Sequence, residues 1–169
     1  MKETGCLLIG ACDSAILDML SRGLRERGAA VVRIAGSGSL LADAQKGLYA
    51  ASQAGRRVCV AAEGEMWAPA LALGIQLHVD RIALLFPRET AKRGRSAERL
   101  NGYVRRNLFF CVSDVLVLED AQMQRSMETL MKRMINAGVW RMQSEKSNAA
   151  VMTAARFLLD EDLSQMAEN

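Results

Sequence analysis

The chain has 169 residues, of which 50% are hydrophobic, 24% are charged and only 5% are aromatic, and its net charge is +3. This length and composition fit a single folded domain with a largely aliphatic core, and they exclude a disordered or low-complexity chain. No apolar run approaches the roughly 18 residues of a membrane span, and the N-terminus lacks a signal-peptide cleavage pattern. We therefore expect a cytoplasmic protein with no membrane partner. The four cysteines never form a C-x-x-C pair, so we expect structural thiols and no metal site.

Short apolar strands alternate with amphipathic helices along the chain. The predicted strands span residues 6–9, 29–34, 57–62, 81–86, 115–118 and 139–142. The first predicted helix begins at a cap on Asp13 or Ser14, and the others span residues 40–54, 68–77, 127–135 and 148–159. Continuous apolar strands joined through helices are typical of a parallel sheet. The sequence thus predicts an α/β, Rossmann-like fold, a mostly parallel sheet of about six strands with helices on both faces. One domain covers residues 1–160, and residues 161–169 form an acidic, frayed tail.

Two apolar groups late in the chain are predicted to lie in the core. The helix over residues 127–135 carries a buried face at helical spacing, formed by Met127, Leu130, Met131, Met134 and Ile135. The aromatic pair Phe109 and Phe110 precedes the fifth strand, and we interpret both rings as core.

Signals for catalysis are weak. The single histidine, His78, lies between a helix and the fourth strand, at the end of the sheet opposite the usual ligand crevice. We interpret it as structural and predict no catalytic triad. Glu63 and Glu65 flank Gly64 at a strand end, where paired carboxylates could act as acid and base, although solvated loop acids are commoner. No H-E-x-x-H, Walker A or G-x-G-x-x-G pattern occurs, and we assign no catalytic residue and no cofactor.

Turns that enter helices offer unpaired N–H groups to anions, and such turns follow several predicted strands, including one over residues 10–14. The candidate phosphate-binding residues are Gly36, Ser37, Gly38, Ser39, Gly64, Ser126 and Thr129. The Gly-Ser-Gly-Ser turn is the best candidate, because its glycines allow close backbone approach and its hydroxyls can donate hydrogen bonds. A plain structural turn explains the same pattern equally well.

Positive charge is concentrated between the fourth and fifth predicted strands. Seven basic side chains stand there against two acidic ones, a local balance of +5 that leaves −2 for the rest of the chain. A basic segment beside strand ends suggests a phosphate-bearing partner. A solvated surface helix explains Arg95 and Arg99. It explains Arg105, Arg106 and Asn107 less well, because these residues directly precede an apolar run.

An ordered series of short motifs resembles the DNA-processing protein A family (DprA, also called Smf), part of a Rossmann-like superfamily that includes the LOG nucleotide hydrolases. At its centre, Arg106-Asn107 leads through a short helix into Ser113-Asp114-Val115-Leu116-Val117-Leu118-Glu119, similar to the family's arginine–asparagine motif and its leucine-serine-aspartate strand. Ser126-x-x-Thr129 resembles the serine–threonine pattern that follows. The order of the motifs matches over about residues 5–160.

This resemblance implies a non-catalytic protein that binds single-stranded DNA or a nucleotide, forms a homodimer and cooperates with a recombinase. It also implies the residues that would contact nucleic acid: Arg105, Arg106 and Asn107 on phosphates, with Arg88, Lys92 and Arg93 widening the positive surface. The chain departs from the family at Arg125, which replaces a glycine between two serines. Residues 118–123 lack the P-G-G-x-G-T-x-x-E motif of the LOG enzymes, so their hydrolase activity is not expected.

Two other functions stay open at this point. The chain could be a degenerate α/β hydrolase in which residues 60–66 form a strand and a former nucleophile elbow. Gly64 would then stand at the nucleophile position, and Ser144-Glu145-Lys146-Ser147 would replace the histidine loop. This alternative predicts no esterase activity, and the strand order of a structure tests it. The chain could also be an enzyme that acts on a nucleotide through Glu63 or Glu65.

Overall fold

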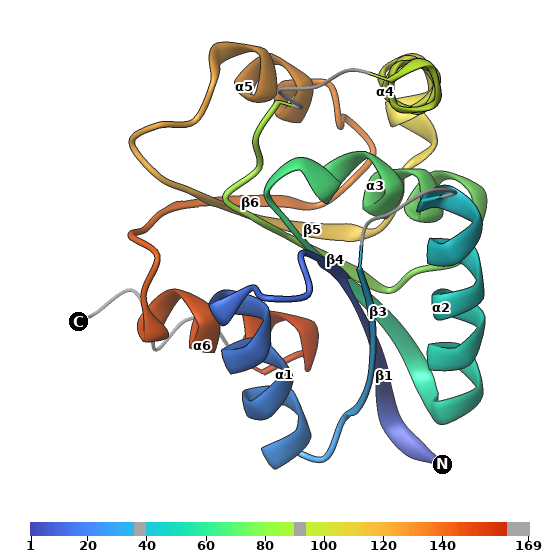
Figure 1. Ribbon diagram of the computed structural model, residues 1–169, viewed down its shortest axis with the longest axis vertical. Coiled ribbons are helices and arrows are strands. Elements are labelled where there is room, and N and C mark those ends of the chain that lie inside the picture. The colour runs from blue at the N-terminus through green and yellow to red at the C-terminus, as the bar shows by residue number, and fades with distance from the viewer. Residues whose placement is uncertain (36–39, 90–93, 162–169) are drawn as a thin grey trace.

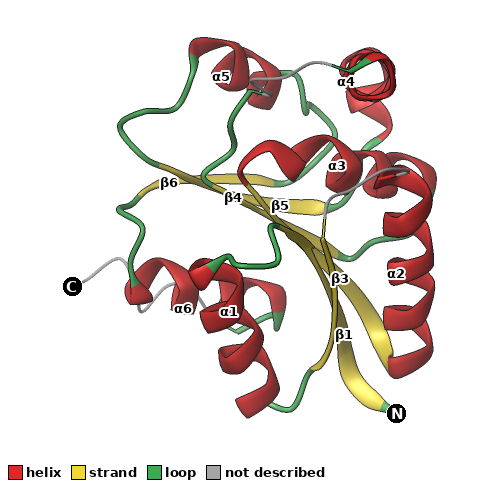
Figure 2. Ribbon diagram, viewed as in Figure 1, coloured by secondary structure: helices red, strands yellow, loops and turns green. Residues whose placement is uncertain are grey.

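The computed structural model describes residues 1–35, 40–89 and 94–161 as one sheet with helices on both sides (Figures 1 and 2). The strands are β1 (Lys2–Gly10), β2 (Ala30–Ala35), β3 (Gly55–Glu63), β4 (Arg81–Leu85), β5 (Asp114–Glu119) and β6 (Val139–Gln143). The helices are α1 (Ala15–Glu26), α2 (Leu40–Ala54), α3 (Trp67–Gln76), α4 (Arg95–Asn107), α5 (Arg125–Lys132) and α6 (Asn148–Leu158). Two 3₁₀ turns, η1 (Gly64–Met66) and η2 (Leu108–Phe110), complete the described elements. The predicted α/β class is confirmed.

The six strands pair in the order β2-β1-β3-β4-β5-β6, and every pairing is parallel. Apolar runs such as Cys6–Ile9 form these strands because both faces of a parallel sheet are covered by helices. The chain crosses back over β1 once, between β2 and β3, and from β3 onwards each strand is added beside its predecessor. All loops that follow the strands therefore meet at one edge of the sheet, which we call the carboxyl edge, and all loops that precede them meet at the opposite, amino edge.

The helices form two layers, one on each face of the sheet (Figure 1). Each layer buries an apolar core against the sheet. Helices α1 and α6 cover one face of the sheet, with core residues such as Leu20 and Ala154. Helices α2, α3, α4 and α5 cover the other face, where the core includes Leu71 and Met127. None of the helices within residues 1–35, 40–89 and 94–161 is long and apolar enough to cross a membrane.

Two glycines let β1 and β3 start close to each other and to α2. A Cβ atom on Gly55 would lie 2.1 Å from the backbone nitrogen of Gly5, and one on Gly5 would lie 2.1 Å from the carbonyl oxygen of Ala51. These contacts are with backbone atoms, which cannot move aside as a side chain can. Any other residue at either position would push the two central strands or α2 apart.

The structure corrects the predicted burial of three side chains. Ile135, Phe109 and Phe110 were expected in the core, but all three are exposed. Helix α5 ends at Lys132, so Ile135 falls in the following loop rather than on the buried helix face. In η2 the side chains step by about 120° per residue, and only Leu108 points into the core.

Candidate functional site at the carboxyl edge

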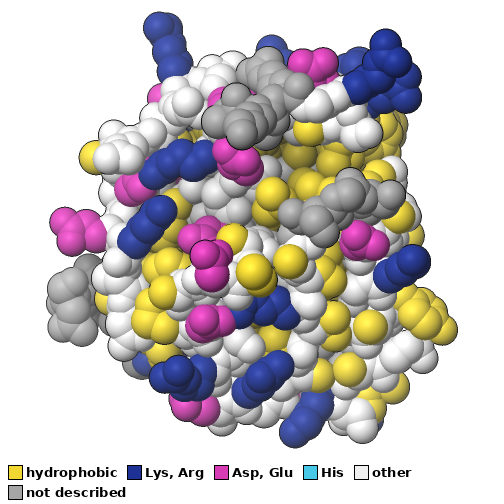
Figure 3. Space-filling view, in the orientation of Figure 1, with side chains coloured by type: hydrophobic (Ala, Val, Ile, Leu, Met, Phe, Trp, Pro, Cys, Tyr) yellow, Lys and Arg dark blue, Asp and Glu magenta, His cyan; other side chains and the backbone are white. Residues whose placement is uncertain are grey.

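The carboxyl edge is where ligands bind in open α/β sheets, because loops from neighbouring strands converge there. In this chain β1, β3, β4, β5 and β6 all send described residues to it. The space-filling view shows Lys and Arg side chains interspersed with Asp and Glu on the visible face, with no single continuous basic area (Figure 3). The interactions between these charged groups decide what chemistry the edge can perform.

The turn after β3 has the shape of a nucleophile elbow. Gly64 has a φ of +61°, and the chain enters η1 and then α3 directly after it. A sharp strand–turn–helix with a left-handed residue at its tip is the geometry that presents a catalytic serine above the sheet in α/β hydrolases. The backbone is held in place by Arg88, whose N–H donates to the carbonyl oxygen of Gly64 at 3.1 Å. Gly64 has no side chain, so the elbow presents no nucleophile.

Ser14 connects the loop after β1 to this elbow. Its Oγ accepts a hydrogen bond from the N–H of Leu17 at 3.1 Å and so caps the N-terminus of α1, as predicted. The same hydroxyl donates to the carboxylate of Glu63, the last residue of β3. These two hydrogen bonds fix the position of the Ser14 side chain.

The loop after β5 carries two carboxylates in ion pairs. Glu119 is only 4% exposed, and it accepts hydrogen bonds from Arg141 Nε and from Gln143 Nε2, the latter at 2.8 Å. This carboxylate raises the pKa of Arg141. Its neighbour Asp120 accepts a hydrogen bond from the guanidinium of Arg88, and that bond lowers the pKa of Asp120.

In an α/β hydrolase the acid of the triad follows the nucleophile in the chain and the histidine comes last. Asp120 stands at the corresponding strand end, two strands along from Gly64, but its partner is Arg88. The loop after β6 contains Lys146, whose Nζ lies 5.7 Å from the ring of Phe86, and Ser147, which caps α6. This loop contains no histidine, so the described residues of the edge supply neither a nucleophile at the tip of the elbow nor an imidazole base.

A narrow cleft lies between α5 and the ends of β5 and β6. Its volume is about 310 Å³, and it is lined by Glu119, Asp120, Ala121, Met123, Glu128, Arg141 and Gln143. Sequence reasoning did not assign a role to these residues. The adjacent acids at the end of the fifth strand were the available signal. Their partners could not be identified, because Arg141 comes from β6 and Arg88 from the loop that follows β4.

The arginines predicted to contact nucleic acid lie in different environments. Arg88 pairs with Asp120, and Arg105 pairs with Glu89 at 2.7 Å while its guanidinium lies 5.6 Å from the centre of the Trp67 ring system. Asn107 donates its side-chain N–H to the carbonyl oxygen of Tyr103 at 2.7 Å. Arg106 is exposed. Lys92 and Arg93 lie outside the described residues.

The residues predicted to bind phosphate also lie in different places. Gly36, Ser37, Gly38 and Ser39 lie outside the described residues. Gly64 is at the carboxyl edge, in contact with Arg88. Ser126 and Thr129 lie on the exposed side of α5, and the hydroxyl of Thr129 donates to the carbonyl oxygen of Arg125 at 3.1 Å.

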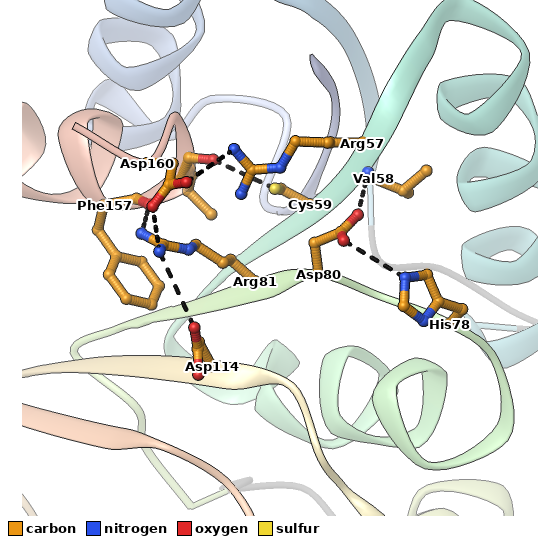
Figure 4. Close-up of polar contacts among 10 residues, drawn as sticks. Arg57, Val58, Cys59, His78, Asp80, Arg81, Asp114, Phe157 and Asp160 are labelled. Carbon is orange, nitrogen blue, oxygen red and sulfur yellow. Dashed lines mark hydrogen bonds and ion pairs between the residues drawn. The ribbon is translucent and has the colours of Figure 1, made fainter. Parts of the chain in front are cut away.

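His78 lies at the amino edge, as predicted, far from the elbow. Its side chain is 85% exposed, and its Nε2 is 3.3 Å from Asp80, which also accepts a hydrogen bond from the N–H of Val58 (Figure 4). Within the part of the chain that the structure describes, no group of three His, Cys, Asp or Glu side chains could hold a metal ion.

No protein-family model matches the chain, and no curated protein matches its sequence. A structure reported with the metagenome-derived lipolytic enzymes LipS and LipT matches with a TM-score of 0.75 at 9% identity, over 95% of this chain and 97% of the other. A protein from Xanthomonas campestris pv. campestris, described as a hydrolase of the α/β superfamily, matches with a TM-score of 0.62 at 15% identity, over 95% and 97% of the two chains. A hypothetical protein from Pseudomonas aeruginosa PAO1 matches with a TM-score of 0.59 at 12% identity, over 94% of this chain and 90% of the other. At such low identities these likenesses show the fold alone, an α/β architecture that the chain shares with these structures.

Proposed function

We propose that this chain is a non-catalytic α/β-hydrolase-like protein that acts by binding rather than by turnover. The observation that carries the proposal is Gly64 at the tip of the elbow, where a hydrolase of this fold needs its nucleophile. The sequence contains one histidine, His78, and it lies at the wrong edge of the sheet. Loss of the serine or the histidine of a triad lowers kcat by about 10⁶-fold, so an elbow without either group retains little chemistry.

The charged groups of the edge support the same conclusion. An active triad leaves its acid free to orient a histidine, whereas Asp120 is bound by Arg88. The hydroxyl of Ser14 lies next to the elbow, but it is already engaged: it caps α1 and donates a hydrogen bond to Glu63. A Ser–Glu pair of this kind lacks the imidazole that moves a proton between nucleophile and leaving group in hydrolases.

The direct test is hydrolysis of p-nitrophenyl acetate and butyrate by the purified protein. We expect a rate equal to that of heat-denatured protein at the same concentration. Two side chains near the elbow could support an unexpected activity, the exposed thiol of Cys12 and the hydroxyl of Ser14. Hydrolysis that is lost in Cys12→Ser or in Ser14→Ala would overturn the proposal.

A restored variant sharpens this test. Lys146 is close enough to Asp120 for its charge to lower the pKa of that carboxylate, after the larger effect of Arg88. A histidine at position 146 would therefore stand near the acid position. We expect Gly64→Ser/Lys146→His to hydrolyse the ester faster than either single variant, because only the pair supplies both a nucleophile and a base.

A second candidate function, nucleic-acid binding, is favoured by one feature of α4. This helix presents three exposed arginines, Arg95, Arg99 and Arg106, at spacings that place them on one side. Such a row can follow a phosphate backbone. Of the predicted contact residues, Arg106 belongs to this row, whereas Arg105 is paired with Glu89.

Fluorescence anisotropy of a labelled oligothymidine, titrated at two salt concentrations, tests this candidate. Binding through α4 should weaken in Arg99→Ala/Arg106→Ala, and the slope of log K against log salt should fall by about 1.4, or about 0.7 per lost contact. The matched control is Arg22→Ala/Arg25→Ala, which removes the same charge from the exposed side of α1. Equal binding by the two double variants would exclude α4 as the nucleic-acid surface.

A further inference from the structure

Exposed apolar side chains gather at the amino edge, away from the elbow. Within the part of the chain that is described, eight large hydrophobic side chains are exposed, and five of them come from the loops that precede β4, β5 and β6. These five, which we call the amino-edge patch, are Leu77 (46% exposed), Phe109 (46%), Phe110 (54%), Val112 (72%) and Ile135 (75%). Because β4, β5 and β6 are neighbours in the sheet, the three loops are neighbours too.

Contacts between the loops show that the patch is continuous. Leu77, Phe110 and Val112 line one hollow of about 400 Å³. The ring centres of Phe109 and Phe110 are 4.0 Å apart, and the side chain of Asn136, next to Ile135, donates to the carbonyl oxygen of Phe109 at 2.8 Å. The three loops therefore form one surface.

Two exposed arginines stand next to the apolar side chains in the sequence of these loops. Arg106 comes three residues before Phe109, and Arg133 comes two residues before Ile135. One belongs to the end of α4 and the other directly follows α5, so positive charge borders the patch from two elements.

The acidic side chains of the same loops are engaged with other groups. Asp80 and Asp114 line the hollow, but Asp80 accepts a hydrogen bond from the N–H of Val58 at 2.7 Å and lies 3.3 Å from His78. Asp114 points towards Arg81, at 3.9 Å from its guanidinium (Figure 4). The patch thus combines exposed hydrocarbon with positive charge that these acids do not neutralise.

This combination matches the surface of an anionic bilayer. A single apolar anchor binds a membrane only marginally, and stable attachment takes a second signal such as a group of basic side chains. The amino-edge patch supplies the apolar part. Arg106 and Arg133 supply the basic part, since each basic side chain near an anionic surface strengthens binding about fivefold.

We propose that the amino edge docks on the surface of an anionic membrane. The amino-edge patch then lies at the boundary between headgroups and acyl chains, and Arg106 and Arg133 lie at the lipid phosphates. Val112 and Ile135 are the most exposed of the five side chains, and a bilayer accepts projecting side chains without a matched cavity. A nucleic acid would engage the arginines but leave these aliphatic side chains without a partner, because they cannot stack on bases as aromatic rings do.

A surface contact of this kind needs no spanning helix. The expectation of no membrane partner rested on the absence of a spanning segment, so it does not bear on this contact. The proposal is also independent of the proposed function, because the elbow lies at the opposite edge of the sheet.

Co-sedimentation of the full chain with lipid vesicles tests the proposal. The protein should sediment with vesicles of equal parts phosphatidylcholine and phosphatidylglycerol, and more weakly with phosphatidylcholine alone, which carries no net charge. Arg106→Ala/Arg133→Ala should weaken binding to the mixed vesicles about 25-fold, or about fivefold for each charge. The matched control is Arg22→Ala/Arg25→Ala, which removes the same charge from the exposed side of α1 and should change binding far less.

Insertion of the apolar side chains is tested separately from charge. Val112→Ser/Ile135→Ser keeps the net charge and should weaken binding to the mixed vesicles by at least about tenfold, since each buried CH₂ group strengthens binding about fourfold. Lipids brominated in their acyl chains should quench the fluorescence of Phe109→Trp more than that of the wild type, whose Trp67 and Trp140 lie outside the patch.

Circular dichroism confirms that each variant is folded. Wild-type protein that stays in the supernatant of the mixed vesicles, equal losses in the two arginine double variants, or undiminished binding by Val112→Ser/Ile135→Ser would each overturn the proposal. Sedimentation with washed cell membranes but not with vesicles of pure lipid would identify a protein partner and overturn it as well.

Discussion

The two edges of the sheet differ in what they expose. At the carboxyl edge, charged side chains pair across neighbouring loops, and in the described part of the chain none of the large exposed hydrophobic residues belongs to a loop that follows a strand. At the amino edge, three adjacent loops expose five such residues. In enzymes of this fold the carboxyl edge carries the chemistry. Here the described charged groups of that edge, such as Arg88 with Asp120 and Arg141 with Glu119, are paired with one another, and the exposed apolar side chains gather at the other end.

The largest effect on stability is expected at the buried carboxylate of Glu119. Glu119→Ala removes the partner of Arg141 and Gln143 and should lower the free energy of unfolding by about 3 kcal/mol, the lower end for a broken buried pair because Arg141 is 33% exposed. Urea unfolding followed by circular dichroism measures it. Glu128→Ala, on the exposed side of the same cleft, should shift the midpoint far less. Equal shifts would show that the ion pairs of the carboxyl edge do not stabilise the fold.

A smaller effect, with a pH dependence, is expected at Asp120. Asp120→Asn weakens the bond to Arg88 and should cost about 1–2 kcal/mol at pH 7. Because the pKa of Asp120 is lowered in the folded state, the stabilisation is present above the unfolded pKa of about 3.9 and is lost as the pH falls through the folded pKa. The difference between wild type and variant should therefore shrink between pH 5 and pH 2. A difference that stays constant over this range would contradict the ion pair.

The two serine caps allow a matched comparison of about 1 kcal/mol. Ser14 and Ser147 each cap a helix, but only Ser14 also donates to a carboxylate at the elbow. Ser147→Ala should cost about 1 kcal/mol, and Ser14→Ala should cost more. If thermal unfolding gives the two variants the same stability, the bond between Ser14 and Glu63 contributes nothing measurable.

The smallest effect concerns thiol reactivity, which we expect to be absent at the amino edge. Cys12 is exposed in the loop after β1, whereas Cys6, Cys59 and Cys111 are buried. A hydrogen bond with Cys59, together with burial, raises the pKa of Cys6, and burial raises the pKa of Cys111. We expect Ellman's reagent to modify one thiol per native chain, and none in Cys12→Ser. A second reactive thiol that disappears in Cys111→Ser would mean that the loop between Phe110 and Val112 opens in solution.

The sequence was sufficient for the strands, since each depends on a local pattern. Gly64 after an apolar strand already marked a possible elbow. The pairing of Arg88 with Asp120 could not be predicted, because it depends on which strand ends are neighbours and no local pattern sets the strand order. The exposure of Ile135 was missed for a similar reason: its spacing continues the apolar face of α5, but the helix ends three residues earlier. Whether the arginine–asparagine element binds DNA stays a prediction.

The strand order also affects how the chain can fold as it is synthesised. The pairing of β1 with β3 joins Gly5 to Val58, so the centre of the sheet cannot form until more than 50 residues have been made. From β3 onwards each new strand meets an edge that is already in place, and β4, β5 and β6 can be added one after another. At about 5–20 residues per second, residues 1–63 take on the order of several seconds to emerge. During that interval only β2 can pair with β1. The other edge of this strongly apolar strand stays unpaired until β3 has been made.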